Sequence, residues 1–357
     1  MFSLYNDSKT KAFGLDVSDS DIKVMELGVH GSNLFPIAWS QVPILPGVIA
    51  NHMIVNEKKL AENIKSAIEA ASHIGTVYVV ASIPESKSFV RVLKMPKIPM
   101  AELDGAIPFE IEQSIPVPLE LVYMDWQLLR ETPEGMEVLV TATPKDYVNS
   151  YASTLKEAGL IPVAFELESQ AMARSLVAQD DQSTALIADI SSLQTSFIIV
   201  EEGNVQYTSS IPIAGNSLTE SISRNLKISP VEAETIKRER GLVADIKKGN
   251  IRQAILPLLD NIVNEIKNVA RFHEEHSPKH TSIAKIILSG GSAKLPGIAD
   301  YIAARMSLSS QKSSGEVILG NPWINIADIS KVKLPLSQID ALSYCTVAGL
   351  ALRGATS

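Results

Sequence analysis

One five-residue pattern occurs twice in this chain and limits its possible folds more than any other feature. The segment Gly-Leu-Asp-Val-Ser at 14–18 is echoed by Ile-Ala-Asp-Ile-Ser at 187–191, so that Asp16 and Asp189 lie 173 residues apart. In each copy an apolar strand ends in a short polar turn, and a second apolar strand follows. A pattern repeated at this separation predicts two related lobes, each beginning with a β-hairpin.

The polar turns of both hairpins carry groups suited to binding phosphate. Hydroxyl and turn N–H groups donate to phosphate oxygens, and the two aspartates would hold Mg²⁺ through water. Asp and Ser also favour tight turns on structural grounds, so either hairpin alone leaves a purely structural role open. Facing each other across a cleft, the two hairpins could hold a triphosphate. The expected contacts are Asp16, Ser18, Asp19, Ser20 and Lys23 from the first hairpin and Asp189, Ser191, Ser192 and Thr195 from the second.

A third element is the glycine turn in Ser-Gly-Gly-Ser-Ala-Lys-Leu-Pro-Gly at 289–297, between a predicted strand and a predicted helix. Glycines let a ligand approach the backbone, and a helix N-terminus favours negative charge. We predict nucleotide contacts from Gly290, Gly291, Ser292 and Lys294. Two aspartate hairpins followed by such a turn is the order found in the actin, Hsp70 and sugar-kinase superfamily.

Hydrophobic periodicity predicts strands that alternate with helices, which is typical of an α/β fold. Lobe one is expected at 1–180 and lobe two at 181–357. Six prolines between 84 and 118 exclude a long helix there, so we expect a small inserted subdomain at about 91–137. The expected strands are 13–17, 22–27, 76–83, 138–143, 185–190, 196–200, 205–211 and 285–289. The expected helices are 58–71, 147–158, 216–226, 230–240, 251–276, 296–306 and 337–352.

Composition excludes several classes of function. The net charge of −8 and pI near 5.4 provide no basic field for nucleic acid. The single cysteine, Cys345, lies in an apolar run and is expected to be a core residue in a reducing compartment. The sequence contains no apolar stretch of about 18 residues, so we expect no membrane-spanning helix. Neither GxxxxGK[ST] nor GxGxxG is present, so other common nucleotide-binding loops are absent from the sequence.

Over nearly its whole length the chain resembles the PilM family of actin-like type IV pilus assembly proteins, and more distantly FtsA of cell division. The similar segments are 14–27, 106–118, 154–168, 211–222, 232–238 and 289–297. The resemblance implies an actin-like, ribonuclease H-like fold that binds ATP and Mg²⁺. It adds Glu168, Gly215, Glu234 and Lys237 to the expected nucleotide contacts.

The resemblance also implies a partner. A PilN-like inner-membrane protein would hold this chain, through a cytoplasmic tail, at the inner face of the cytoplasmic membrane, where it would work with other pilus assembly proteins. We expect the insert to be too short to bury all of its apolar residues on itself, which predicts an open groove for that tail. The groove residues would be Ile107, Phe109, Ile111 and Ile115. The alternative is that these residues only dock the insert onto lobe one.

Two departures from the family pattern concern catalysis. Serine occupies positions 18 and 191, where the family usually has glycine in Asp-x-Gly. If those positions need a positive φ, each serine costs on the order of 1 kcal/mol. We also find no residue to orient an attacking water, so no catalytic residue is assigned and hydrolysis is expected to be slow or absent. An FtsA-like filament protein and an actin-fold small-molecule kinase remain as alternatives. An FtsA-like protein usually has a basic amphipathic C-terminal helix. An actin-fold kinase needs an acidic base near its substrate pocket.

Overall fold

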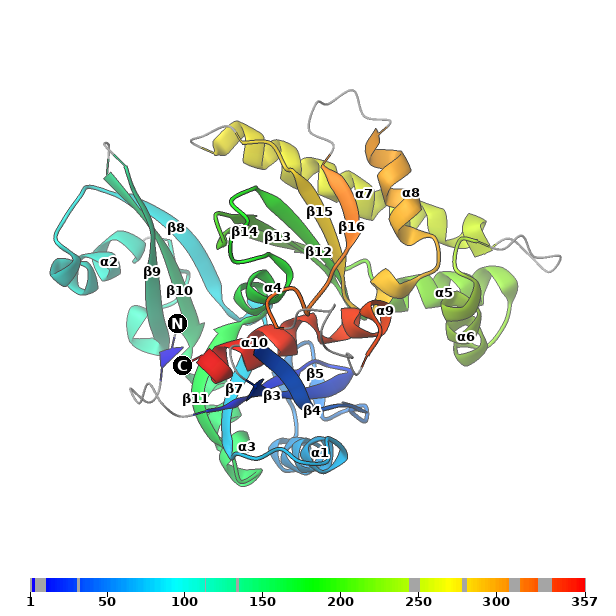
Figure 1. Cartoon of the computed structure of the whole chain (residues 1–357), viewed down its shortest axis with the longest axis horizontal. Helices are drawn as coiled ribbons and strands as arrows, with labels where there is room; N and C mark the ends of the chain where they lie inside the picture. Colours follow the sequence, from blue (N-terminus) through cyan, green and yellow to red (C-terminus); the bar gives the residue numbers. More distant parts are fainter. Residues whose placement is uncertain are drawn as a thin grey trace. The chain divides into compact units, whose positions relative to one another are not determined.

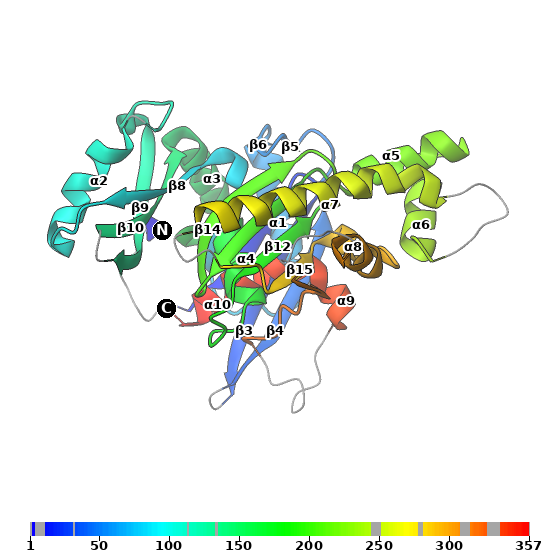
Figure 2. The same cartoon turned by 90° about the horizontal axis from the view of Figure 1, so that it is seen from above.

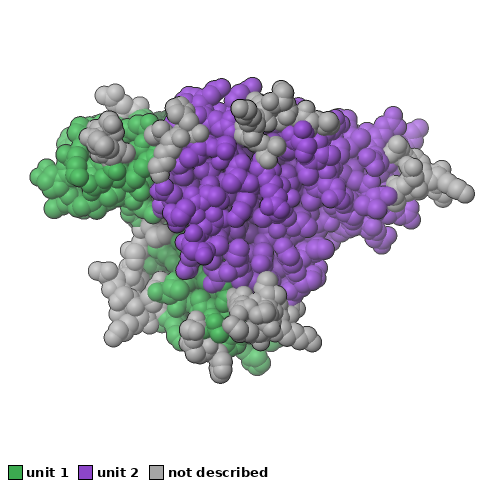
Figure 3. Space-filling model, turned by 45° about the horizontal axis from the view of Figure 1, so that its top comes forward, with its two compact units in different colours: residues 1–175, 326–333, 346–357 green, residues 176–325, 334–345 purple. Residues whose placement is uncertain are grey.

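The computed structural model describes residues 2–3, 11–30, 33–112, 114–132, 135–243, 251–277, 281–307, 315–326 and 336–356. The chain forms two compact units (Figure 3). Unit one contains residues 1–175, 326–333 and 346–357, and unit two contains 176–325 and 334–345. The sequence-based division at 180 did not include the return of residues 346–357 to unit one.

Unit one is built on a six-stranded sheet with the order β1-β11-β7-β2-β3-β4 (Figure 1). The strands are β1 (Phe2–Ser3), β2 (Phe13–Val17), β3 (Asp21–His30), β4 (Asn33–Pro43), β7 (Tyr78–Ile83) and β11 (Ile161–Leu167). Strand β2 pairs antiparallel with β3 and parallel with β7. A separate hairpin joins β5 (Ile49–Ala50) to β6 (Met53–Ile54).

Side chains alternate across strand β2 and define the two faces of this sheet. Phe13 and Leu15 point into the core formed with helices α1 (Glu57–Ala70) and α3 (Lys145–Glu157). The other face is covered by α4 (Glu168–Leu176) and α10 (Cys345–Thr356), and its core includes Ala171 and Leu350. Gly14 faces α10 so closely that an added Cβ would lie 2.5 Å from the Val347 carbonyl oxygen.

The inserted subdomain has its own hydrophobic core. Its three antiparallel strands follow the order β8-β10-β9, and one helix packs on them; these elements are β8 (Phe89–Met95), α2 (Leu103–Ile111), β9 (Val122–Thr132) and β10 (Gly135–Pro144). Ile107, Ile111 and Ile115 are buried in this core. They therefore line no open groove, and that prediction was wrong. Phe109, on α2, is 79% exposed.

Unit two repeats the plan of unit one. Its five-stranded sheet has the order β14-β13-β12-β15-β16. The strands are β12 (Ala185–Ile190), β13 (Thr195–Glu201), β14 (Asn204–Ile211), β15 (Lys285–Ser289) and β16 (Glu316–Leu319). Strand β12 pairs antiparallel with β13 and parallel with β15, as β2 does with β3 and β7. The structural correspondence matches the repeated Asp-x-Ser pattern.

Helices cover the sheet of unit two. They are α5 (Gly215–Leu226), α6 (Pro230–Arg240), α7 (Ile251–His276) and α8 (Ile298–Ser307). Figure 2 shows α7 lying along the sheet, where Ile255, Leu259 and Ile262 are buried against its strands. This is the apolar face that the sequence predicts for 251–276. Among the described residues, no helix is long and apolar enough to cross a membrane.

The predicted single helix at 337–352 is broken in the structure. It consists of α9 (Gln338–Ala341), a 3-10 turn at Leu342–Tyr344, and α10. One cause is that the Leu342 carbonyl accepts a hydrogen bond from the N–H of Gly290 at 3.1 Å. Cys345 is buried, as predicted for a core residue.

Candidate functional site

The first aspartate hairpin places Asp16 near the end of β2, where its side chain is buried. Lys23 lies directly opposite on β3, and its Nζ is 3.5 Å from Asp16 Oδ2. Ser82, on the neighbouring strand β7, donates to Asp16 Oδ1 at 2.9 Å. The predicted contacts Asp16 and Lys23 are thus brought together, and Ser82 joins them through sheet pairing that no local sequence signal reveals.

The turn of this hairpin is organised around the hydroxyl of Ser18. Its Oγ accepts from the backbone N–H of Asp21 at 3.0 Å and from that of Ser20 at 3.2 Å. Neither Ser18 nor Ser191 has a positive φ. The backbone strain considered for these two serines is therefore absent. Serine fits this turn because its side chain satisfies two turn N–H groups, as in other Ser-stabilised turns.

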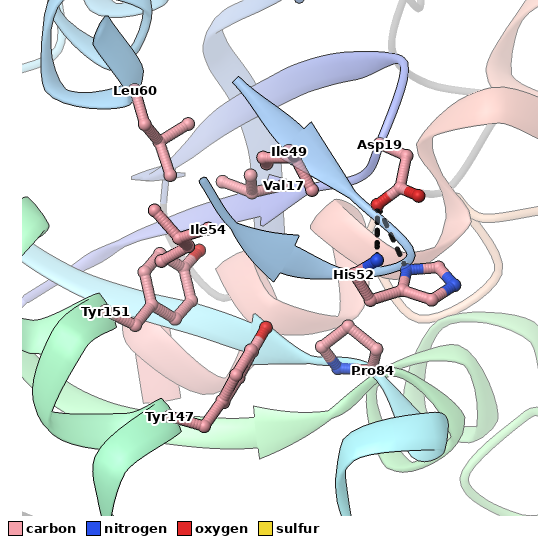
Figure 4. Close-up of a pocket in the computed structure, with 9 residues that line it drawn as sticks. All are labelled: Val17, Asp19, Ile49, His52, Ile54, Leu60, Pro84, Tyr147 and Tyr151. Atoms are coloured by element: carbon pink, nitrogen blue, oxygen red, sulfur yellow. Dashed lines mark hydrogen bonds and ion pairs between the residues drawn. The ribbon is translucent and has the colours of Figure 1, made fainter. Parts of the chain in front are cut away.

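Asp19 is held away from solvent by a second hairpin. Its Oδ1 accepts from the backbone N–H of His52 at 2.8 Å and lies 3.5 Å from the His52 Nδ1 (Figure 4). Asn51 and His52 both have positive φ, at 50° and 58°, which is the geometry of a tight two-residue hairpin turn. Asp19 therefore connects the β5–β6 turn to the first aspartate hairpin, which is a structural role.

A small pocket lies behind Asp19 in unit one. Figure 4 shows its lining residues, which are Val17, Asp19, Ile49, His52, Ile54, Leu60, Pro84, Tyr147 and Tyr151. Burial raises the pKa of Tyr147, and the charges of Glu168 and Asp19 raise it further. The predicted contact Glu168 therefore belongs to the same charged surroundings as Asp19.

In unit two, Asp189 accepts hydrogen bonds from two serines. Ser191 Oγ donates to Asp189 Oδ2 at 2.6 Å, and Ser289 Oγ donates to Asp189 Oδ1 at 2.9 Å. Gly290 follows with φ 86°, and an added Cβ there would lie 2.8 Å from Asp189 Oδ1. Only glycine combines this backbone conformation with this close approach. The glycine turn is therefore packed directly against the second aspartate, as the order of motifs predicts.

The start of α5 is joined to the same hairpin. The Ser191 carbonyl accepts from the Gly215 N–H at 3.0 Å and from Ser292 Oγ at 3.1 Å. The Ser192 carbonyl accepts from the Asn216 N–H at 2.9 Å. An added Cβ at Gly215 would overlap Ser292 Oγ and lie 3.2 Å from the Ser191 carbonyl oxygen, so glycine suits this close packing.

Helix α6 adds a charged pair beside Gly215. The buried Lys237 donates through Nζ to the Gly215 carbonyl at 3.0 Å and pairs with Glu234 at 2.7 Å. Thr219, which the sequence analysis missed, donates to the same carboxylate. Burial opposes the charged form of Glu234, but the hydrogen bonds from Lys237 and Thr219 outweigh it and lower its pKa to about 2.

Two further predicted contacts in unit two have partners of their own. Thr195 is buried, and its hydroxyl donates to the Ile213 carbonyl at 2.6 Å. Lys294 donates to the Asp340 carbonyl at 2.9 Å. Gly291, by contrast, has open space, since an added Cβ would meet only Ser343 Oγ at 3.8 Å. The predicted residues of unit two thus form a connected group, with Thr195 serving the turn itself.

A second hollow in unit one lies where the insert strand β10 meets β7, β11 and α4. Its lining residues are Ile83, Thr141, Thr143, Phe165, Glu166, Leu167 and Gln170. Glu166, in β11, belongs to a residue type that is usually exposed. Instead its side chain is buried and bonds both guanidinium nitrogens of Arg174, at 2.7 and 2.5 Å.

Comparison with solved structures shows the fold. The protein of a PilM-PilN type IV pilus biogenesis complex matches with a TM-score of 0.82 at 25% identity, over 97% of this chain and 99% of that one. The ethanolamine utilization protein EutJ of Carboxydothermus hydrogenoformans matches with a TM-score of 0.57 at 15% identity, over 98% and 92%. MreB5 of Spiroplasma citri bound to ADP matches at 0.54 and 13%, over 97% and 96%. The predicted actin-like α/β fold is confirmed.

Sequence comparison shows the family. Cell division protein FtsA of Neisseria meningitidis serogroup B is 24% identical over 245 residues, which are 58% of this chain and 59% of that protein. The chain thus spans about three fifths of the length of this curated relative. The model of the type IV pilus assembly protein PilM family matches residues 14–355. This match over almost the whole length shows that the chain belongs to the PilM family of type IV pilus assembly proteins.

Proposed function

We propose that this protein is a nucleotide-binding platform of type IV pilus assembly, held at the inner face of the cytoplasmic membrane by the tail of a PilN-like protein. The observation that carries the proposal is the match, over 97% of this chain, to the protein of a PilM-PilN complex. The MreB5 structure with ADP adds that an actin-like relative of this fold binds a nucleotide.

The residues of the candidate site fit a nucleotide. Glycines at 215, 290 and 291 leave backbone close to the second hairpin. The buried Lys237 and the partly exposed Glu234 offer a polar pair for a ribose or base. Serine hydroxyls at 191 and 292 are donors of the kind that phosphate accepts, once they rotate away from their present acceptors. Asp16 and Asp189 would hold Mg²⁺ through water, because Ser82 and Ser191 already donate to their carboxylate oxygens. Bound Mg²⁺ would neutralise phosphate charge.

Calorimetric titration with ATP, with and without Mg²⁺, tests this part of the proposal. We expect binding, and we expect Asp189→Ala to weaken it at least about tenfold, a loss of about 1.4 kcal/mol, because the Asp189 carboxylate also fixes the turn of Ser289 and Gly290. Glu220→Gln, an exposed change on α5, is the matched control. Absence of heat and of any thermal shift at millimolar ATP contradicts nucleotide binding. Turnover at or above about 1 s⁻¹, the low end for enzymes, contradicts a slow or absent hydrolysis.

For the partner tail we propose the hollow beside Gln170 in place of the buried isoleucines. Its lining combines apolar side chains with the hydroxyls of Thr141 and Thr143 and the amide of Gln170. Six of its seven lining residues are themselves buried, so the tail would reach the hollow at the half-buried Gln170.

The test is a fluorescence titration with a peptide of the cytoplasmic tail of a PilN-like protein. Gln170→Arg, which puts a long charged side chain into the hollow, should weaken binding at least about tenfold. Gln206→Arg, the same change on β14 of unit two, and Phe109→Ala, on the exposed side of α2, should leave it unchanged. If Phe109→Ala weakens binding and Gln170→Arg does not, the tail binds the outer face of the insert instead. If the tail peptide binds neither the unaltered protein nor any variant, the proposed platform role is wrong.

A further inference from the structure

Two predicted phosphate donors of the first hairpin, Ser18 and Lys23, and two of its turn N–H groups already have acceptors within that hairpin. The Ser20 and Asp21 N–H groups donate to Ser18 Oγ. Ser18 Oγ donates in turn to Asp21, with its carbonyl oxygen at 3.0 Å and its Oδ1 at 2.9 Å. Lys23 Nζ donates to Asp21 Oδ1 at 2.6 Å, closer than its 3.5 Å approach to Asp16. The sequence analysis did not single out Asp21.

The Asp21 carboxylate is fixed at the place where a bound phosphate would accept hydrogen bonds from the first hairpin. Its Oδ1 accepts from Lys23 and Ser18, and its Oδ2 accepts from Gln41 Nε2 at 2.7 Å. These are three donors around one anion, the arrangement that proteins use for phosphate oxygens. Burial opposes the charged form, but the Lys23 ammonium and the hydrogen bonds from Lys23, Gln41 and Ser18 keep the pKa of Asp21 below its ordinary value. The carboxylate is therefore ionised at neutral pH.

The second hairpin lacks this carboxylate. The repeat that aligns Asp16 with Asp189 also aligns Asp21 with Gln194 and Lys23 with Ser196. Gln194 Nε2 lies 3.5 Å from Ser196 Oγ, a contact between uncharged groups. Of the two hairpins, only the first carries a carboxylate at this turn position.

We propose that Asp21 is a specificity-determining residue, an internal anion that occupies the phosphate donors of the first hairpin. A nucleotide phosphate that approached Lys23 would meet a carboxylate of like charge held by the same donors, and the two anions would repel. Affinity for a nucleotide therefore comes mainly from its base and ribose and changes little with the number of phosphates. This inference rests on the proposed nucleotide binding and adds the selectivity of that same site.

The experiment compares adenosine, ADP and ATP by calorimetry on the full chain, with and without Mg²⁺. In the unaltered protein, ATP and adenosine should bind within about threefold of each other. Asp21→Asn removes the charge and keeps the shape of the side chain. It should strengthen the binding of ATP at least about tenfold, a difference of about 1.4 kcal/mol, and leave the binding of adenosine unchanged. Asp21→Ser should do the same. Glu62→Gln, on the exposed side of α1, removes the same charge elsewhere in unit one and should change nothing. Thermal unfolding checks that all variants are folded.

Other outcomes overturn the inference. If the ratio of ATP affinity to adenosine affinity is the same in Asp21→Asn and Asp21→Ser as in the unaltered protein, Asp21 does not control phosphate binding. Nucleotide binding itself then stands. Weaker ATP binding in these variants only with Mg²⁺ makes Asp21 a ligand of the metal ion instead. If neither the unaltered protein nor either variant binds any of the three compounds, both the inference and nucleotide binding fail.

Discussion

At the scale of single residues, Glu234 shows how the candidate site holds a charge. Its carboxylate accepts from Lys237 and Thr219, and Arg238 Nε donates to its other oxygen at 2.7 Å. Together these donors lower its pKa from 4.5 to about 2 in spite of burial. A carboxylate whose pKa is lower in the folded state contributes stability above its unfolded pKa and loses it as the pH falls toward the folded value.

We therefore expect the free energy of unfolding of Glu234→Gln to depend less on pH than that of the unaltered protein. Above pH 4.5 the variant should be less stable by about 1–2 kcal/mol, after allowance for solvent screening of a partly exposed group. The difference should shrink between pH 4.5 and about 2. Urea unfolding at pH 7, 5, 4 and 3 measures it, with Glu239→Gln on the same helix as control. A constant difference across this range contradicts the stated role of Glu234.

Glu166 marks the limit of what the sequence could predict at this scale. A lone Glu after an apolar strand is usually exposed, and nothing local tells that it is buried. Its partners, Arg174 on α4 and Arg353 on α10, are brought to it by sheet and helix packing, with the Arg353 Nη1 at 3.7 Å. Asp16 and Asp189 were predictable because repetition, not local chemistry, identified them. Ser82 and Ser289 required the parallel pairing of β7 and β15.

At the scale of elements, the packing of α10 depends on glycine. An added Cβ at Gly349 would overlap the Ala171 carbonyl of α4, and one at Gly354 would overlap the Ala12 carbonyl. Backbones can approach this closely only where no side chain intervenes. The apolar run predicts this helix, but its glycines and its break at 342–344 depend on contacts far away in the sequence.

Gly349→Ala should lower the free energy of unfolding of unit one by about 1–3 kcal/mol or more, because the overlapping atoms belong to backbone and cannot move aside easily. Gly105→Ala is the matched control, since it lies in α2 with nothing within 4 Å of an added Cβ. That change should stabilise the protein by up to about 1 kcal/mol, the ordinary helix preference for Ala over Gly. Urea unfolding of both variants measures the two effects. Equal effects of the two changes would show that α10 does not pack closely on α4.

At the scale of the whole molecule, the repeated hairpin predicts two sheets of the same plan, because each sheet begins with the same local sequence pattern. Two such sheets are typical of the actin-like fold. The positions of most helices follow from hydrophobic periodicity alone, as for 251–276. The insert was interpreted less well, because its apolar residues were expected to exceed what so short a segment can bury. In fact α2 and three strands enclose them, with Leu103, Ile107 and Ile111 fully buried. Apolar composition does not say whether a small segment closes a core by itself.

Deletion of residues 346–357 should unfold unit one and leave the sheet of unit two intact. The deletion removes Leu350 and its neighbours from the core beneath β2, β7 and α4, and each large buried side chain contributes about 2–5 kcal/mol. Domains have only about 5–15 kcal/mol in total. Hydrogen exchange should show loss of protection in β2 and β7 and continued protection in β12 and β15. Leu350→Ala should give a partial loss, and unchanged exchange in β2 and β7 would disprove this dependence.

The return of α10 to unit one also sets the order of events during translation. Residues 1–175 leave the ribosome first but lack the helix that covers one face of their sheet until 346–356 have been synthesised. At roughly 5–20 residues per second, that wait lasts on the order of ten to forty seconds. Unit two is nearly complete at residue 325 and acquires most of its strands and helices earlier in that interval. The amino-terminal half of the chain is therefore expected to finish folding last and to be the part that chaperones protect on the nascent polypeptide.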